Sequence, residues 1–139
     1  MGKSKKPEDF DFVKDAYFND LTRNQKLAIL NFFSVIAASN AKIKISEIES
    51  AFISQYYKEF GMTGDQYLAY ISVGGRERTI EDIKSLNKEN MQDLVYATTE
   101  LFNCDGELNE NEFSVLINWL DDIGMSIEAW NDMLEHNGE

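Results

Sequence analysis

The chain has 139 residues, 43% of them hydrophobic and 27% charged, which is typical of one soluble folded domain and excludes an intrinsically disordered chain. Its net charge of −12 originates in the last third, because residues 89–139 hold 13 of the 25 acidic residues and no Lys or Arg. Nucleic acid, which is bound through clustered basic side chains, is disfavoured. A basic protein face or a divalent cation suits this region, and a solvated acidic surface that keeps the protein soluble is the alternative.

One cysteine, Cys104, excludes an intramolecular disulfide, and the chain has neither a secretory signal nor an apolar run that could span a membrane. We therefore expect a cytoplasmic protein. Residues 1–7, with three lysines, are predicted to be a flexible basic tail. Residues 8–139 are predicted to be a single helical domain, since Pro7 is the only proline and no later proline interrupts long helices.

Apolar residues at helical spacing predict a first helix from Glu8 to about Asp20. Thr22-x-x-Gln25 resembles a capping box, and it opens a strongly apolar helix that ends near Ser39 and is expected at the centre of the fold. Ser46-x-x-Glu49 opens the next helix, which Gly61 ends.

Thr63-x-x-Gln66 is expected to begin a helix that runs to about Val73. Gly74-Gly75 is expected to end this helix, and Arg76-Glu77-Arg78 is predicted to be a polar loop. The alternative is that this segment binds an anion before the helix that starts at Thr79. A short helix is expected from Thr79 to Leu86.

Asn87 is expected to cap a helix that ends at the turn Asp105-Gly106. A further helix follows, with Gly124 as its stop, and Ser126 caps the last one. Within the helix before Gly124, four apolar residues are predicted to face the core: Phe113, Leu116, Ile117 and Leu120. The chain shows no strand pattern, so the predicted fold is all-α, a compact bundle of about seven to eight helices.

The segment from Leu101 to Glu112 is either a tight structural turn or a cation-binding loop. Asp105 and Glu112 are the candidate ligands, with Asn103, Asn109 and Glu47 as further donors, and oxygen donors of this kind suit Ca²⁺ or Mg²⁺. In the structural alternative, Glu112 is the last residue of a capping box that begins at Asn109.

An EF-hand loop can also be laid on this segment, with Gly106 at its sixth position and Glu112 at its twelfth. The first position, which requires Asp, is then Leu101. A hydrophobic residue at that position should weaken Ca²⁺ binding strongly.

An internal repeat is indicated when Asn40 is aligned with Asp105, which lies 65 residues later. This alignment pairs Ala41 with Gly106 and Glu47 with Glu112. It predicts two pseudo-repeated helix-turn-helix halves, and chance matching of amphipathic helices is the alternative. The first copy lacks the Asp and the Gly, so it keeps the spacing without the charge.

An apolar helix followed by Asp-Gly-x-Leu-x-x-x-Glu (Asp105 to Glu112), with a degenerate first copy from Asn40 to Glu47, resembles the TerB-like family of tellurite resistance and the N-terminal domain of DjlA-type co-chaperones. The resemblance covers roughly residues 21–134. It implies a compact all-helical domain with no established catalytic activity and a metal site of clustered acids. It also implies a link to stress-response assemblies that include membrane proteins of the TerC type.

The sequence thus predicts a non-enzymatic interaction module with protein partners, which bind through the acidic Glu89–Glu139 region, without nucleic acid and without membrane insertion. A degenerate EF-hand-like Ca²⁺ sensor and an acidic inhibitor or immunity-type protein that binds a basic partner are the alternatives. An enzyme is not expected, because no nucleophile–base pair or metal-ligand set is visible in the sequence.

Overall fold

The computed structural model describes residues 17–39, 47–103 and 110–136, which form seven α-helices and no strand. The all-α prediction is therefore confirmed for this part of the chain. The helices, in order, are α1 (Arg23–Ser39), α2 (Glu47–Phe60), α3 (Gly64–Ile71), α4 (Gly75–Lys84), α5 (Lys88–Asn103), α6 (Glu110–Ile123) and α7 (Ile127–His136).

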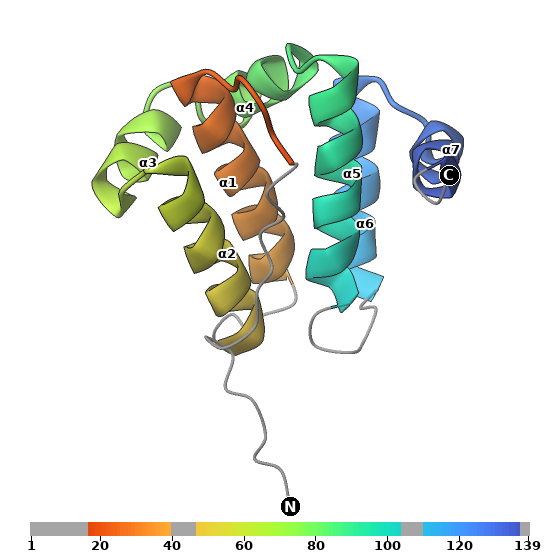
Figure 1. The fold of residues 1–139 in the computed structure, drawn as a ribbon, viewed down its shortest axis with the longest axis horizontal. Coiled ribbons are helices and arrows are strands. Elements are labelled where there is room, and N and C mark those ends of the chain that lie inside the picture. The colour runs from red at the N-terminus through yellow and green to blue at the C-terminus, as the bar shows by residue number, and fades with distance from the viewer. Residues whose placement is uncertain (1–16, 40–46, 104–109, 137–139) are drawn as a thin grey trace, which may run out of the picture.

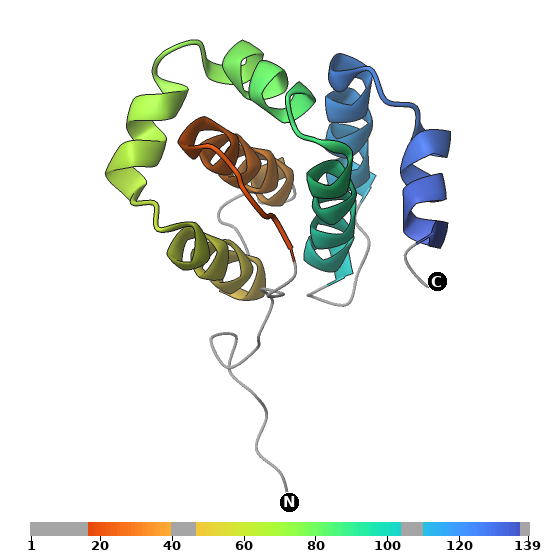
Figure 2. The same ribbon diagram turned by 45° about the horizontal axis from the view of Figure 1, so that its top comes forward.

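The central helix is α1, which packs against α2, α3, α4, α5 and α6 (Figures 1 and 2). All its residues from Leu27 to Phe33 are buried. A helix that is apolar around its whole circumference can be stable only when other elements enclose it, so its composition determines its place in the fold.

Two antiparallel helix pairs, α1 with α2 and α5 with α6, run alongside each other (Figure 1). The C-terminal ends of α1 and α5 and the N-terminal ends of α2 and α6 lie at one end of the bundle, and α4 crosses the opposite end. α4 contacts α1, α3 and α6, so it ties the two pairs together.

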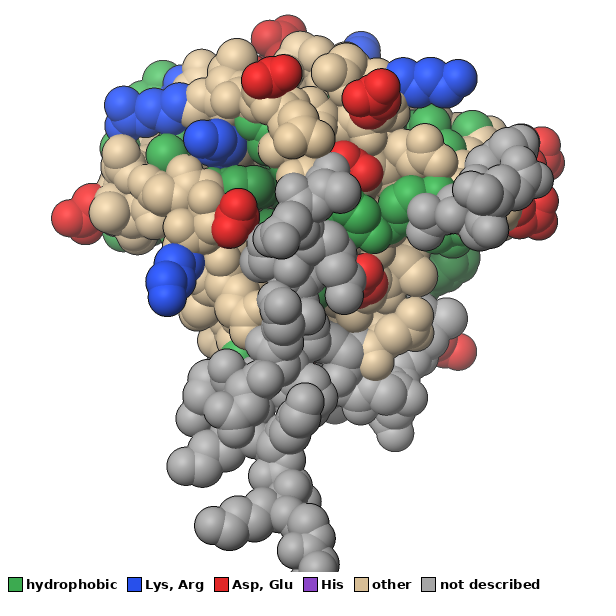
Figure 3. Space-filling model, in the orientation of Figure 1, with side chains coloured by type: hydrophobic (Ala, Val, Ile, Leu, Met, Phe, Trp, Pro, Cys, Tyr) green, Lys and Arg blue, Asp and Glu red, His purple; other side chains and the backbone are tan. Residues whose placement is uncertain are grey.

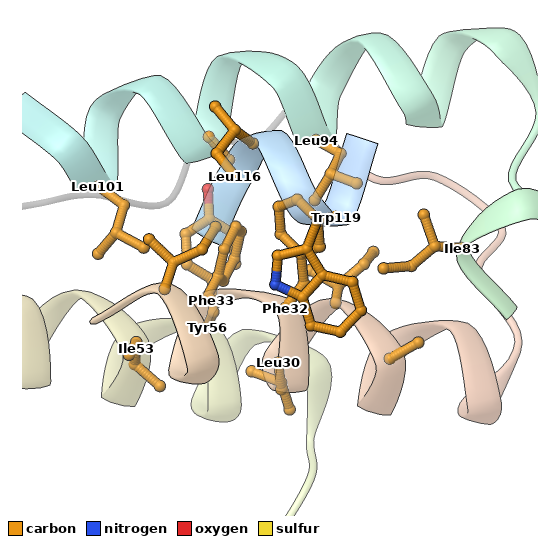
Figure 4. Close-up of a cluster of buried hydrophobic side chains, with 14 of the residues drawn as sticks. Leu30, Phe32, Phe33, Ile53, Tyr56, Ile83, Leu94, Leu101, Leu116 and Trp119 are labelled. Atoms are coloured by element: carbon orange, nitrogen blue, oxygen red, sulfur yellow. The ribbon is translucent and has the colours of Figure 1, made fainter. Parts of the chain in front are cut away.

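Aromatic side chains from α1, α2 and α6 fill the core (Figure 4). Trp119 of α6 is fully buried and lies against Phe32 of α1, with 5.3 Å between the ring centroids. Phe33 packs on Phe52 and Tyr56 of α2 at 5.5 and 5.3 Å. Burial of each such side chain stabilises the fold by roughly 2–3 kcal/mol.

The helix ends agree with the predicted caps in most places. At Thr22 and Thr63 the hydroxyl accepts from the backbone N–H three residues later, and the Gln at that position accepts in return. The side chains of Asn87 and Ser126 cap α5 and α7 by single hydrogen bonds of 2.7 and 3.0 Å. Local chemistry is sufficient to fix these boundaries.

The expected helix from Glu8 to Asp20 is wrong for its last residues, since residues 17–20 are not helical; residues 8–16 lie outside the described part. Phe18 and Asp20 have positive φ angles of 60° and 62°, which no right-handed helix contains. The backbone N–H of Phe18 donates to Asp93 and that of Asn19 to Asn90, so contacts with α5 hold this segment in place of helical hydrogen bonds.

The prediction of a polar loop at Arg76–Arg78 and a helix start at Thr79 is also wrong, because α4 begins at Gly75. Gly74 takes a left-handed conformation with φ of 88° and turns the chain directly into α4. Thr79 is therefore inside the helix, where its hydroxyl donates to the carbonyl of Gly75.

Candidate functional site

Three of the five residues predicted to supply cation ligands are described, and Glu47, Asn103 and Glu112 lie at the end of the bundle opposite α4. Glu112 is the third residue of α6 and is fully buried. Asn103 ends α5 and is exposed, and Glu47 begins α2 and is exposed. Asp105 and Asn109 lie outside the described residues. The structure thus describes three of the five, and of these only Glu112 is enclosed by protein.

A second carboxylate, Glu49, which was predicted only as part of a capping box, is also buried and is 1% exposed. It is the third residue of α2, the same position that Glu112 has in α6. Gly61 and Gly124, which end these two helices, are 63 residues apart, and so are Glu49 and Glu112. An alignment made on the two glycines would have found Glu49, whereas the offset of 65 paired Glu112 with the exposed Glu47.

Carboxylates in the first turn of a helix are stabilised by its unpaired N–H groups and by its dipole, so this is where burying Glu49 and Glu112 costs least. Oxygen donors such as Asp105 and Glu112 fit a hard cation of the Ca²⁺ or Mg²⁺ type. Within residues 17–39, 47–103 and 110–136, no three His, Cys, Asp or Glu side chains form a group that could hold a metal ion.

Both arginines of the predicted anion cradle are engaged with protein. Arg76 lies over the Trp119 ring, 4.3 Å from its centroid, and donates to the carboxylate of Asp122. Arg78 lies over the Tyr70 ring at 4.4 Å and donates to the side chain of Asn24 at 3.2 Å. These contacts make the two arginines anchors of α4.

Asp93 of α5 forms a hydrogen bond with the segment that leads into α1. Its carboxylate accepts a hydrogen bond of 3.0 Å from the Phe18 N–H, and Asn90 brackets Asn19 by one donated and one accepted bond. Burial raises the pKa of Asp93, the hydrogen bond from Phe18 opposes that shift, and the charge of Glu89 adds to it. Burial, with the charge of Glu100, likewise raises the pKa of Tyr17 to about 12.

One groove borders α3 and another borders α7. A groove of about 250 Å³ lies between α1 and α3, and its lining includes Arg23, Leu27, Gln66, Ala69 and Tyr70. A groove of about 480 Å³ lies between α5 and α7, lined by Lys88, Gln92, Ala129, Asp132 and Met133. Five lining residues of the first groove and the five of the second are separated by 65 positions between α1 and α5 and by 63 between α3 and α7, whereas Asn24 and Arg78 line the first groove alone.

A second pair of grooves follows the glycine turns. A groove of about 450 Å³ beside α2 and α3 is lined by Ser54, Tyr57, Lys58, Met62 and Gly64. Each of these has a counterpart 63 residues later in a groove of about 210 Å³ beside α6 and α7: Ile117, Leu120, Asp121, Met125 and Ile127. The two grooves differ in charge, since Lys58 lines the first and Asp121 the second.

The prediction that four apolar residues of α6 face the core is wrong for two of them. Leu116 and Leu120 are buried, but Phe113 is 40% and Ile117 36% exposed. Trp119 and Ile123 face the core from α6 as well, and α6 turns Phe113 and Ile117 outward.

Figure 3 shows basic side chains along the top and left of one face, with acidic side chains among them. At the right-hand side, beside α7, the charged side chains in view are acidic. Of the helices in the described ranges, none has both the length and the apolar character needed to cross a membrane. Comparison of the chain with protein-family models, with curated proteins and with solved structures finds no match.

Proposed function

We propose that this protein is a non-enzymatic, TerB-like helical interaction module that binds protein partners through its acidic last third and responds to a divalent cation at the turn before α6. The observation that carries the proposal is the complete burial of Glu112 in the first turn of α6, shortly after Asp105 in the sequence. Carboxylate oxygens are the ligands that Ca²⁺ and Mg²⁺ take in proteins, so Asp105 and Glu112 are suited to hold such a cation. A role in stress-response assemblies follows from the resemblance.

The interaction role is supported by the acidic side chains on the outside of α6 and α7. Glu110, Asp121, Glu128, Asp132 and Glu135 are all exposed, and no Lys or Arg lies between residues 89 and 139. An acidic surface repels acidic proteins and attracts basic ones, so it selects its partners by charge.

We also infer that the two halves are pseudo-repeats, in which α1–α3 correspond to α5–α7 and α4 has no counterpart. The matching grooves support this, as do the glycine turns: the N–H of Met62 bonds to the Tyr57 carbonyl, and that of Met125 to the Leu120 carbonyl. In this alignment Glu49, and not Glu47, is the counterpart of Glu112.

The EF-hand alternative is weakened by Leu101. This residue, which would hold the first ligand position, is fully buried inside α5 and contributes to the core. A sensor of this type would have to bind Ca²⁺ with its first ligand missing. An acidic inhibitor of a basic enzyme remains compatible with the surface and differs from the main proposal only in what the partner does.

The cation response is tested by calorimetry and thermal unfolding of metal-stripped protein with Ca²⁺, Mg²⁺, Mn²⁺ and Zn²⁺. At a concentration tenfold above its dissociation constant, a bound ion stabilises the protein by about 1.4 kcal/mol. We expect Asp105→Asn and Glu112→Gln to remove this gain and Glu81→Gln, at an exposed position of α4, to retain it. If no ion shifts the unfolding midpoint of the unmodified protein, the cation part of the proposal fails.

A further inference from the structure

The outer face of α6 carries an apolar strip that ends in a groove. Phe113 and Ile117 lie one turn apart and are 40% and 36% exposed. Ile117 also lines the groove of about 210 Å³ together with Met125 and Ile127, which are half-buried. The strip therefore continues from the side of α6 onto the beginning of α7.

The fold itself does not require apolar residues at these positions. The counterparts of Phe113 and Ile117 on α2 are Ser50 and Ser54, and both serines are exposed. A helix in the same structural position thus does without an apolar outer face. A contiguous apolar strip that is flanked by polar residues marks a surface that another molecule can cover, whereas single exposed apolar residues do not.

Carboxylates stand at both ends of the strip. Glu110 lies one turn before Phe113, Asp121 lies one turn after Ile117, and both are exposed. Four residues along a helix return the chain to the same face, so Glu110 and Asp121 are separated by about 16 Å along that face. In the groove of the first half, the position of Asp121 is taken by Lys58, which reverses the charge.

We propose that this face of α6, defined by Glu110, Phe113, Ile117 and Asp121, docks a basic amphipathic helix of a partner protein. The apolar side of that helix would cover Phe113 and Ile117, and Lys or Arg about three turns apart would meet Glu110 and Asp121. This inference rests on the proposed function and specifies its site. A second copy of the chain is a poor occupant, because two such faces would bring like charges together.

The test uses fluorescence anisotropy with a labelled peptide of about 14 residues, built from Leu and Lys in an amphipathic helical pattern, in about 0.1 M salt. A peptide with Glu in place of Lys is the probe control. Two substitutions replace a residue by its counterpart in the first half, Ile117→Ser and Asp121→Lys. Glu110→Gln is matched by Glu47→Gln, the same change at the equivalent exposed position of α2.

We expect the Leu-Lys peptide to bind and the Leu-Glu peptide not to bind. Ile117→Ser and Asp121→Lys should each raise the dissociation constant about fivefold or more, whereas Glu47→Gln should change it less than about twofold. Both groove variants should unfold within about 2 °C of the unmodified protein, because the positions are exposed and Lys is favourable near a helix C-terminus.

Three results would overturn the inference. The first is no binding of the Leu-Lys peptide. The second is peptide binding that is weakened equally by every substitution of an acidic residue, Glu47→Gln included, and that Ile117→Ser leaves unchanged. This result would support the proposed function through a diffuse acidic surface, but it would contradict a site on α6. The third is a dimer, detected by analytical ultracentrifugation, that Ile117→Ser dissociates.

Discussion

The carboxylate of Asp93 is held half-buried on α5 by a neighbouring backbone N–H, with Glu89 one turn away. Its raised pKa means that the folded protein binds a proton at Asp93 more readily than the unfolded chain does. As the pH falls from neutral through the folded pKa, Asp93 therefore adds to the free energy of unfolding, and the gain is complete below the unfolded value.

The variant Asp93→Asn lacks this titration and can still accept from Phe18 through its amide oxygen. We expect it to be at least as stable as the unmodified protein at pH 7, and we expect its advantage to disappear as the pH is lowered toward 4. Urea denaturation across that range measures the difference. If the unmodified protein instead lost stability relative to the variant on acidification, the Phe18 hydrogen bond would outweigh burial.

Single residues are where prediction from the sequence succeeded least at the candidate site. Glu112 was identified from its spacing after Asp105, but its burial and that of Glu49 depend on packing that no local pattern encodes. The outward position of Phe113 and Ile117 has the same origin. α6 has more apolar residues than one face can hold, and Trp119, the largest, occupies the core.

The helices α2 and α6 end in the same way, with a glycine in the left-handed conformation. Gly61 has φ of 67° and Gly124 of 78°, and a Cβ added at either would meet no atom within 4 Å. Only backbone strain then opposes a side chain at these positions. Such strain is a property of the turn, so it should be similar at Gly61 and Gly124.

We expect Gly61→Ala and Gly124→Ala each to lower the free energy of unfolding by about 1–2 kcal/mol, and by similar amounts. Gly64→Ala is the matched control, because Gly64 also has open space around it but lies in the first turn of α3 without a positive φ. That substitution should be neutral or stabilising by up to about 1 kcal/mol. Unequal costs at Gly61 and Gly124, measured by chemical denaturation, would count against equivalent turns.

Helices and their ends were largely predictable, since caps such as Thr22 and Thr63 and stop residues such as Gly61 act over a few residues. Of the two failures, the first has a tertiary cause and the second a local one. The segment before α1 is not helical because its backbone forms hydrogen bonds with side chains of α5. Helix α4 begins earlier than predicted because Gly74 turns the chain directly into it.

Across the whole molecule, a buried chain of hydrogen bonds joins α1, α3 and α4. Asn31 donates to Thr79 at 2.9 Å and accepts from the Tyr67 hydroxyl at 2.7 Å, and Thr79 donates in turn to the Gly75 carbonyl. Asn31 is only 7% exposed and Thr79 fully buried. Such a network fixes how three helices meet, because a polar group left unsatisfied there is costly.

A double-mutant cycle with Tyr67→Phe and Thr79→Val tests this network. Each substitution leaves one end of the Asn31 amide without its partner and should cost about 1–3 kcal/mol of unfolding free energy. Because both act on the same amide, their effects should be non-additive by about 0.5 kcal/mol or more. Simple additivity would show that the two hydrogen bonds are energetically independent.

The contact between Phe32 and Trp119 also bears on how the protein is made. The two residues are 87 positions apart, so α1 leaves the ribosome long before α6 can cover it. At about 5–20 residues per second, the apolar surface of α1 waits roughly 5–20 s for its last partner. During synthesis the exposed apolar surface of α1 is therefore a target for chaperones. Slower translation of the codons for α5 and α6 would lengthen the time for which this surface stays exposed.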